Sequence, residues 1–190
     1  MQITDGTGTN FAVKVNDHNR IEATAICETE IHHDNKVEKQ VYQVKIFLTP
    51  EAIDPSATGT DDLTFFYCKN NSETPMVIEE FRIWVESAEY IDLYKNSDGT
   101  PINTTDITPG NLNFGSGNTA TGLFYKGIDI DGMSGGTFVD RFRIPADDID
   151  HVFTYSSKII IPKNNIITLV AGTGGIPLEV SMLFYYHNNN

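Results

Sequence analysis

Hydrophobic and polar side chains alternate along residues 76–87, MVIEEFRIWVES, and this is the clearest pattern in the chain. The apolar positions of one parity are Val77, Phe81, Ile83 and Val85. The other parity is mostly polar and holds Ile78, Glu80, Arg82, Trp84 and Glu86. A period of two is typical of a strand with one buried and one solvent-facing side. The same alternation predicts a strand over residues 178–187.

Other strands are predicted from short runs of β-branched and aromatic residues that end at Gly, Pro, Asn or Asp. Their ranges are 41–48, 63–69, 90–96, 122–130, 138–144, 151–161 and 166–171. Turn residues predict a hairpin at 96–99, a glycine turn at 131–137 and a long loop at 100–121 with room for short edge strands. No stretch predicts an amphipathic helix, so the fold class is all-β.

The connections between these strands are too short for parallel crossovers, which predicts antiparallel pairing. Eight or nine strands joined by several long connections fit a jelly roll better than an up-and-down barrel. The sequence therefore predicts an antiparallel jelly-roll-type β-sandwich over residues 41–190.

Residues 1–40 contain few large apolar side chains, although 11–15 is a short strand candidate and 20–31 an extended segment. A segment of this kind cannot bury enough apolar surface to fold alone and needs a partner surface. We therefore expect an extended N-terminal arm. Its best candidates for apolar anchors on a partner are Phe11, Val13, Val15, Ile21 and Ile26.

The chain carries a formal net charge of −13, which argues against nucleic acid as a partner because phosphate binding needs clustered Lys and Arg. Most of this charge falls in residues 50–190, which hold eight basic and 19 acidic side chains. No apolar export signal and no run of membrane-spanning length is present, which predicts synthesis in the cytoplasm and no membrane partner. Cys27 and Cys68 are expected to be reduced.

Residues 132–136, GMSGG, match the G-x-S-x-G pattern, and Asp147, Asp148 and His151 follow in the order of a hydrolase triad. That chemistry needs a strand, a tight turn and then a helix, whereas Ser134 precedes another predicted strand. We therefore assign no catalytic residue and expect no enzyme activity, with a hydrolase using Ser134 as a remote alternative.

No cofactor or metal is predicted either. The carboxylates at 129–131 and 147–150 lack EF-hand spacing, which leaves a loop calcium site as an alternative to solvated turns. Residues 32–34, HHD, lack the further ligands of a zinc site. Exposed aromatic residues offer a second alternative, a platform for sugar stacking, made of Trp84, Tyr90, Tyr94 and Tyr125.

Four segments together resemble structural proteins of tailed-bacteriophage particles, in particular head decoration (cement) proteins with a jelly-roll domain. They are VNDHNRIEATAICETEIHHDNKVEKQVYQV, FFYCKNNSETPMVIEEFRIWV, NFGSGNTATGLFYKG and IIIPKNNIITLVA. The resemblance implies a homotrimer on the capsid surface of the virion, with the arm laid across the major capsid protein. The expected function is binding to the capsid lattice and stabilisation of the head.

Related jelly rolls also occur in collars, tail fibres and receptor-binding tips. The alternative function is therefore a tail, fibre or collar module that recognises host cell-surface glycans. In that case loops 51–62 and 100–121 would carry the binding site.

Overall fold

The computed structural model of the chain describes residues 2–4, 10–12, 14–15, 21–22, 40–48, 53 and 63–187. The chain divides into two units, Met1–Lys39 and Gln40–Asn190. In the first unit, β1 (Gln2–Thr4) pairs with β2 (Asn10–Ala12), and β3 (Lys14–Val15) pairs with β4 (Ile21–Glu22), both antiparallel. The role of this unit as an attachment arm stays a prediction.

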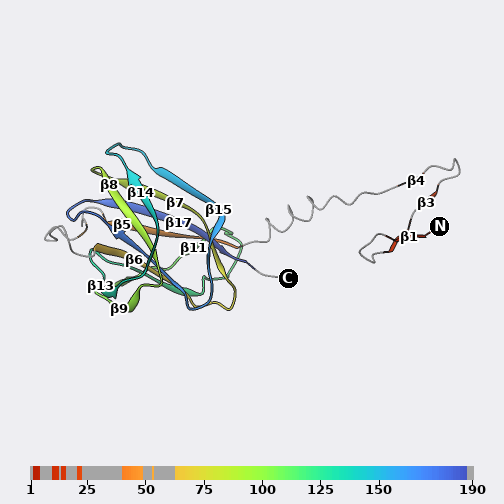
Figure 1. Cartoon of the computed structure of the whole chain (residues 1–190), viewed down its shortest axis with the longest axis horizontal. Helices are drawn as coiled ribbons and strands as arrows, with labels where there is room; N and C mark the ends of the chain where they lie inside the picture. Colours follow the sequence, from red (N-terminus) through yellow and green to blue (C-terminus); the bar gives the residue numbers. More distant parts are fainter. Residues whose placement is uncertain are drawn as a thin grey trace. The chain divides into compact units, whose positions relative to one another are not determined.

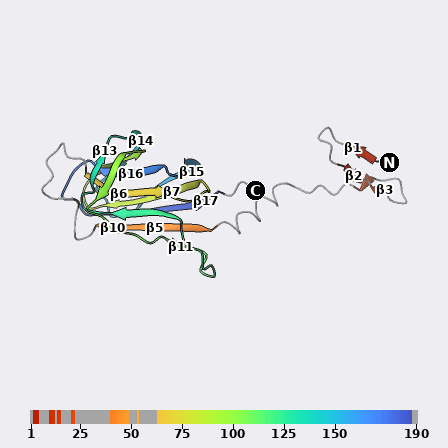
Figure 2. The same ribbon diagram turned by 90° about the horizontal axis from the view of Figure 1, so that it is seen from below.

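The regular elements described in the second unit are all strands, and every pair of neighbouring strands is antiparallel, as predicted. Figures 1 and 2 show the unit in two views 90° apart. The strands are β5 (Val41–Leu48), β6 (Leu63–Asn70), β7 (Met76–Val85), β8 (Glu89–Lys95), β9 (Asp98–Ile102), β10 (Thr105–Asp106), β11 (Gly110–Asn111), β12 (Gly122–Lys126), β13 (Asp131–Ser134), β14 (Thr137–Ile144), β15 (His151–Ile161), β16 (Ile166–Ala171) and β17 (Leu178–Tyr186).

Two sheets form a β-sandwich. One has six strands in the order β10-β12-β6-β16-β8-β14, and the other has five in the order β11-β5-β17-β7-β15. The long strands alternate between the sheets as the chain proceeds, except that β8 and β14 share a sheet. The segment between these two strands supplies the short edge strands and a separate ribbon of β9 and β13.

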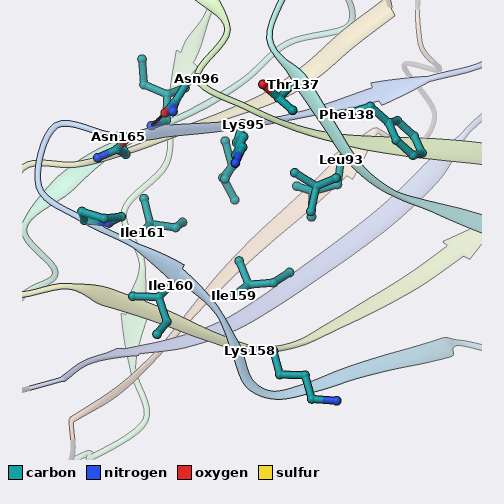
Figure 3. A pocket seen from close by; sticks show the side chains of 14 residues that line it. Leu93, Lys95, Asn96, Thr137, Phe138, Lys158, Ile159, Ile160, Ile161 and Asn165 are labelled. Atoms are coloured by element: carbon teal, nitrogen blue, oxygen red, sulfur yellow. Dashed lines mark hydrogen bonds between the residues drawn. The ribbon is translucent and has the colours of Figure 1, made fainter.

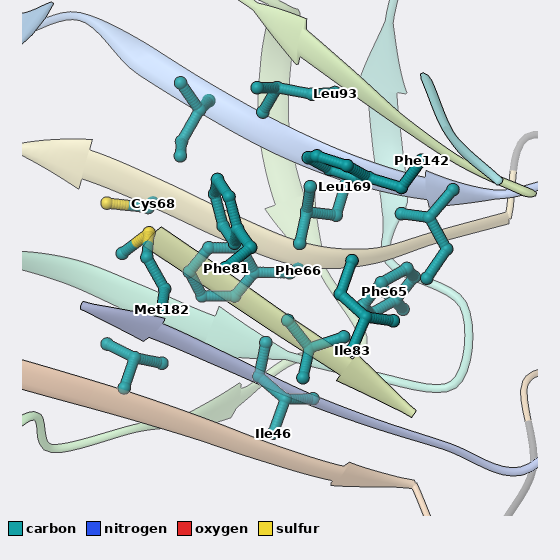
Figure 4. Close-up of a cluster of buried hydrophobic side chains, with 14 of the residues drawn as sticks. Ile46, Phe65, Phe66, Cys68, Phe81, Ile83, Leu93, Phe142, Leu169 and Met182 are labelled. Carbon is teal, nitrogen blue, oxygen red and sulfur yellow. The ribbon is translucent and has the colours of Figure 1, made fainter. Parts of the chain in front are cut away.

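The core lies between the two sheets and is built from aliphatic and aromatic side chains of both (Figure 4). Phe81 of β7 and Phe142 of β14 pack with ring centroids 5.5 Å apart, which joins the sheets at one edge. Phe124 of β12 and Phe184 of β17 stack at 5.4 Å near the opposite edge. Burial of these rings supplies the main stabilisation, because each large aromatic side chain removes much apolar area from water.

The alternation over β7 contains a shift that the sequence pattern does not reveal. Leu183 pairs with Glu80, but the next residue, Phe184, pairs with Ile78, so Glu79 is the extra residue of a β-bulge. On the other side of the bulge, residues with even numbers face the core instead of those with odd numbers, and Ile78 is fully buried there. The assignment of Ile78 to the polar face was therefore wrong for this half of the strand.

Two turn predictions are also wrong. Residues 96–99 do not close a hairpin, because β8 pairs with β14 and β16 while β9 pairs with β13. After β8, the chain turns away from the sheet at Ser97, whose buried hydroxyl lies 3.0 Å from Thr168 Oγ1 of β16. Four residues of the predicted turn at 131–137 form β13, and the strand predicted over 122–130 ends at Lys126. The predicted edge strands within 100–121 are present as β10 and β11.

Cys68 is a free cysteine, as expected, and is fully buried in β6. Its Sγ lies 3.8 Å from Met76 Sδ, and burial raises the pKa of the thiol. The thiol therefore behaves as an apolar core group rather than as a nucleophile. Cys27 lies outside the described residues.

Candidate functional site

One candidate site is an apolar hollow of about 530 Å³ between the free edges of the two sheets, where β14 and β15 are the last strands. We call it the edge groove. Its apolar lining comes from both sheets and from the turn that follows β15 (Figure 3): Leu93, Phe138, Val139, Ile159, Ile160, Ile161, Pro162, Ile166 and Ile167. The volume falls within the range typical of small-molecule sites.

The groove exists because both edge strands bulge at this level. Val139 is an extra residue in β14, between the pairs of Phe138 with Tyr94 and Asp140 with Leu93. In β15, residues 155–158 face the single residue Glu79, and Ser156 has a φ of +49°. Bulges at sheet edges bend the strand and interrupt its ladder. They separate the edges here and leave side chains to line the space.

Polar groups stand at one end of the groove. Lys95 belongs to the same face of β8 as the buried Leu93, so the lysine stem starts from the inner side of the sheet. Asn96, Thr137 and Asn165 accompany it (Figure 3). Both lysines of the lining, Lys95 and Lys158, are exposed. The amine of Lys158 points away from the isoleucines of β15 in the same view.

Next to the groove, one hydrogen bond joins the two edge strands. The Tyr155 hydroxyl donates to Asp140 Oδ2 at 2.6 Å, and the Tyr155 ring packs edge-on against Phe81 and Phe142. Burial raises the pKa of Tyr155 well above its ordinary value, and this hydrogen bond raises it further. The hydroxyl is therefore protonated at neutral pH and can act as the donor in this bond.

A second candidate site is the loop that follows β11, in which Phe114 is 96% exposed. Asparagine side chains hold the loop: Asn111 donates to Gln40 Oε1 at 2.8 Å and to the Asn118 carbonyl at 3.0 Å, and accepts from the Asn113 N–H at 2.9 Å. Gln40 is also the first residue of the second unit. The loop therefore presents an exposed aromatic ring at the end of the sandwich that is joined to the first unit.

The four aromatic residues proposed as a sugar platform do not form one surface. Trp84 is on β7 in the five-stranded sheet, whereas the three tyrosines are on β8 and β12 in the other sheet. Tyr125 stacks on Tyr67 at 5.6 Å, and Tyr94 packs against Phe138 at 5.8 Å. The guanidinium of Arg141 covers the Tyr90 ring at 4.1 Å and donates twice to Asp92, at 2.6 Å each. These three tyrosine rings serve contacts within the six-stranded sheet.

The residues of the hydrolase pattern are only partly brought together. His151 Nε2 lies 2.8 Å from Asp147 Oδ1, but no hydrogen bond in the described part of the chain joins either residue to Ser134. Ser134 ends β13 and is opposite Asp98 of β9, with two glycines and then β14 after it. The strand–turn–helix context of a hydrolase nucleophile is absent at this position.

Across the described residues, no group of three or more His, Cys, Asp or Glu side chains is arranged to hold a metal ion. The carboxylate of Asp131 accepts a hydrogen bond from the Asn103 side-chain amide. Residues 32–34 lie outside the described residues.

Three of the five predicted arm anchors can be located by their backbone. Phe11 is opposite Ile3 in the β1–β2 pair, and Val15 is opposite Ile21 in the β3–β4 pair. Val13 and Ile26 lie outside the described residues. The anchor role of all five residues stays a prediction. Phe114 was not singled out in the sequence, where its only signal is an aromatic residue between Asn113 and Gly115 in a turn-rich loop.

Comparisons with protein-family models, curated proteins and solved structures found no match. Within the described ranges, the structure has no helix with the length and apolar character needed to cross a membrane.

Proposed function

We propose that this chain is a capsid decoration (cement) protein of a tailed bacteriophage, which binds the major capsid protein lattice and stabilises the head. The resemblance of four sequence segments motivates this proposal. The observation that carries it is the exposed Phe114 ring, on the loop that Asn111 joins to Gln40. A fully exposed Phe on a loop fixed by hydrogen bonds is suited to insertion into a partner surface, since it loses little conformational entropy on binding.

The proposed fold of the sandwich is a jelly roll. If the eight long strands are numbered in chain order from β5 to β17, their order is 1-8-3-6 in one sheet and 2-7-4-5 in the other. This order supports two interlocked Greek keys, the arrangement of jelly-roll domains. The strands β10, β11 and β12 would then be additions from the segment between the fourth and fifth strands.

In the proposed complex, the end of the sandwich that carries Phe114 and Gln40 faces the capsid. Residues 1–40 would spread over the major capsid protein with Phe11, Val13, Val15, Ile21 and Ile26 as anchors. Two attachments joined in one chain bind more tightly than either does alone. A homotrimer would multiply this effect further, and the acidic sandwich would keep the decorated virion soluble.

Cosedimentation of the purified chain with particles stripped of it tests the proposal. We expect Phe114→Ser to weaken particle binding about tenfold or more, as is typical when an aromatic anchor is truncated. Phe47→Ser is the matched control, because Phe47 is also exposed but lies on the outer face of β5. If both variants bind the particles as tightly as the unmodified chain does, Phe114 makes no contribution to the contact.

Deletion of residues 1–39 tests the second attachment and keeps Gln40, which accepts a hydrogen bond from Asn111. The sandwich has its own hydrophobic core, so the truncated chain is expected to unfold cooperatively in denaturant but to lose particle binding. Undiminished binding by the truncated chain would contradict a role for the arm.

One observation favours recognition of cell-surface glycans as a second candidate function. Phe47 and Trp84 flank Glu179 in one row across the outer face of the five-stranded sheet. A hollow of about 150 Å³ in this face is lined mainly by polar side chains: Gln43, Lys45, Phe47, Arg82, Asp150, Glu179, Val180 and Ser181. Aromatic rings beside polar groups suit sugars, and a glycan array probed with the full chain and with Trp84→Ala would test this function.

A further inference from the structure

We propose that the edge groove binds a small amphipathic anion, an apolar chain or ring that ends in a carboxylate or sulfonate. This inference goes beyond the proposed decoration function and does not depend on it. It rests on the shape, the lining and the charge of the groove.

The apolar part of the site is open to solvent but continuous with the core. Leu93 and Ile167 at its base are almost fully buried, whereas Phe138 and Val139 at its rim are 51% and 41% exposed. Apolar side chains that stay half exposed around a hollow of this size gain free energy when an apolar ligand removes them from water. The site can therefore take up an apolar group without a rearrangement of the core.

The charge of the lining selects the polar end of the ligand. The chain has twice as many acidic as basic side chains, yet the charged residues of the lining are two lysines, Lys95 and Lys158. Neither lysine forms an ion pair with another residue that the structure describes. A carboxylate near Lys95 would gain a charge-assisted hydrogen bond, and the amides of Asn96 and Asn165 supply further donors.

The edge strands favour a small ligand over an added strand of a partner protein. Strand addition needs an uninterrupted row of free backbone groups along an edge. The extra residue Val139 interrupts that row in β14, and residues 155–158 interrupt it in β15. What the site offers is therefore a set of side chains rather than a backbone ladder.

Calorimetry and amide NMR of the full chain with decanoate test the proposal, with decyltrimethylammonium as the ligand of opposite charge. We expect saturable binding of decanoate, shifts of the amide signals of 158–161 and 165–167, and affinity about tenfold above that for the cation. Equal affinity for the two ligands, no binding of decanoate, or amide shifts elsewhere would overturn the proposal.

Variants locate the charge and the apolar contact. Lys95→Gln is expected to weaken decanoate binding about fivefold, whereas Lys45→Gln removes the same charge from the outer face of β5 and should have no effect. Val139→Glu should abolish binding, whereas Val152→Glu makes the same change at an exposed position outside the groove. Equal loss in each matched pair would contradict a specific site.

A further measurement uses an extended acidic peptide as the competing ligand. If such a peptide binds in place of decanoate and protects the amides of β14 or β15 from hydrogen exchange, the groove is an edge for strand addition and the small-ligand proposal is wrong. If the peptide leaves these amides unprotected while decanoate binds, the small-ligand assignment holds.

Discussion

The two edges of the sandwich are finished in opposite ways. At one edge, the chain crosses from β10, which pairs with β12 in the six-stranded sheet, to β11, which pairs with β5 in the other sheet. Backbone hydrogen bonds of 2.8 Å hold this strap on both sides, from Ile107 N–H to the Phe124 carbonyl and from Leu112 N–H to the Val41 carbonyl. At the other edge, residues 145–150 join β14 directly to β15, and within the described residues no further strand pairs with the outer side of either.

This difference separates stability from binding. The strap supplies backbone partners to strands that would otherwise be open edges, which is a common protection against unwanted pairing. The open edge is protected by bulges instead, and the bulges leave the edge groove between the sheets. A fold that needed only stability could cover both edges, so the uncovered edge is the better place to look for a ligand.

The largest predicted effect tests whether the core contributes as much to the free energy of unfolding at the open edge as at the strapped edge. Phe142→Ala removes a fully buried ring that packs against Phe81, Phe153 and Tyr155, and should lower the free energy of unfolding by about 4 kcal/mol. Phe124→Ala, at the strapped edge, should cost a similar amount. Urea denaturation of both variants checks this, and a much smaller loss for Phe142→Ala would mean that the open edge is loosely packed.

The strands themselves could be predicted from the sequence where one simple pattern covers the whole element. Residues 41–48, 151–161 and 166–171 were predicted with the bounds that the structure has. In contrast, the bulge at Glu79 depends on how β17 pairs with β7, residues about 100 positions apart in sequence. Local patterns carry no information on such pairing, so the pattern places Ile78 on the solvent-facing side of the strand although it is buried.

The edge groove could not be predicted for the same reason. Leu93, Val139 and Ile159 meet only because β8, β14 and β15 come together at one edge of the sandwich. The wrong hairpin at 96–99 shows the same limit, because the local turn signal was outweighed by pairing of β8 with two distant strands. Of the site residues named from sequence, Phe11, Val15 and Ile21 are located only by their backbone pairing, and their function stays a prediction.

The second prediction weakens the strap. Asn111→Ala removes three side-chain hydrogen bonds, to Gln40, Asn113 and Asn118, and should lower the free energy of unfolding by about 1.5 kcal/mol. Hydrogen exchange of the Leu112 amide should accelerate by more than the global loss of stability explains. Unchanged protection of this amide would mean that the backbone bond to Val41 holds the strap without the side chain.

A smaller effect is expected at the open edge. Tyr155→Phe removes the hydrogen bond to Asp140 and should cost about 1 kcal/mol at neutral pH, because the half-buried Asp140 can turn to water. The folded pKa of Tyr155 is raised, so its contribution is complete below the pKa of an unfolded tyrosine, about 10, and is lost as pH rises above it. Stability should therefore fall more steeply above pH 10 in the unmodified chain than in Tyr155→Phe. Parallel pH profiles would contradict this.

The smallest effect on stability is predicted for the rim of the groove, and it is the result that separates the two edges most clearly. Val139 and Val152 are both exposed, at 41% and 52%, so Val139→Glu and Val152→Glu should each change the free energy of unfolding by less than about 0.5 kcal/mol. Urea denaturation measures both. Equally small effects would mean that the rim can be changed without damage to the fold, so that a loss of decanoate binding by Val139→Glu alone reports on the edge groove. A cost of about 2 kcal/mol at Val139 alone would instead mean that the rim belongs to the core, and that the open edge is a weaker version of the strapped one.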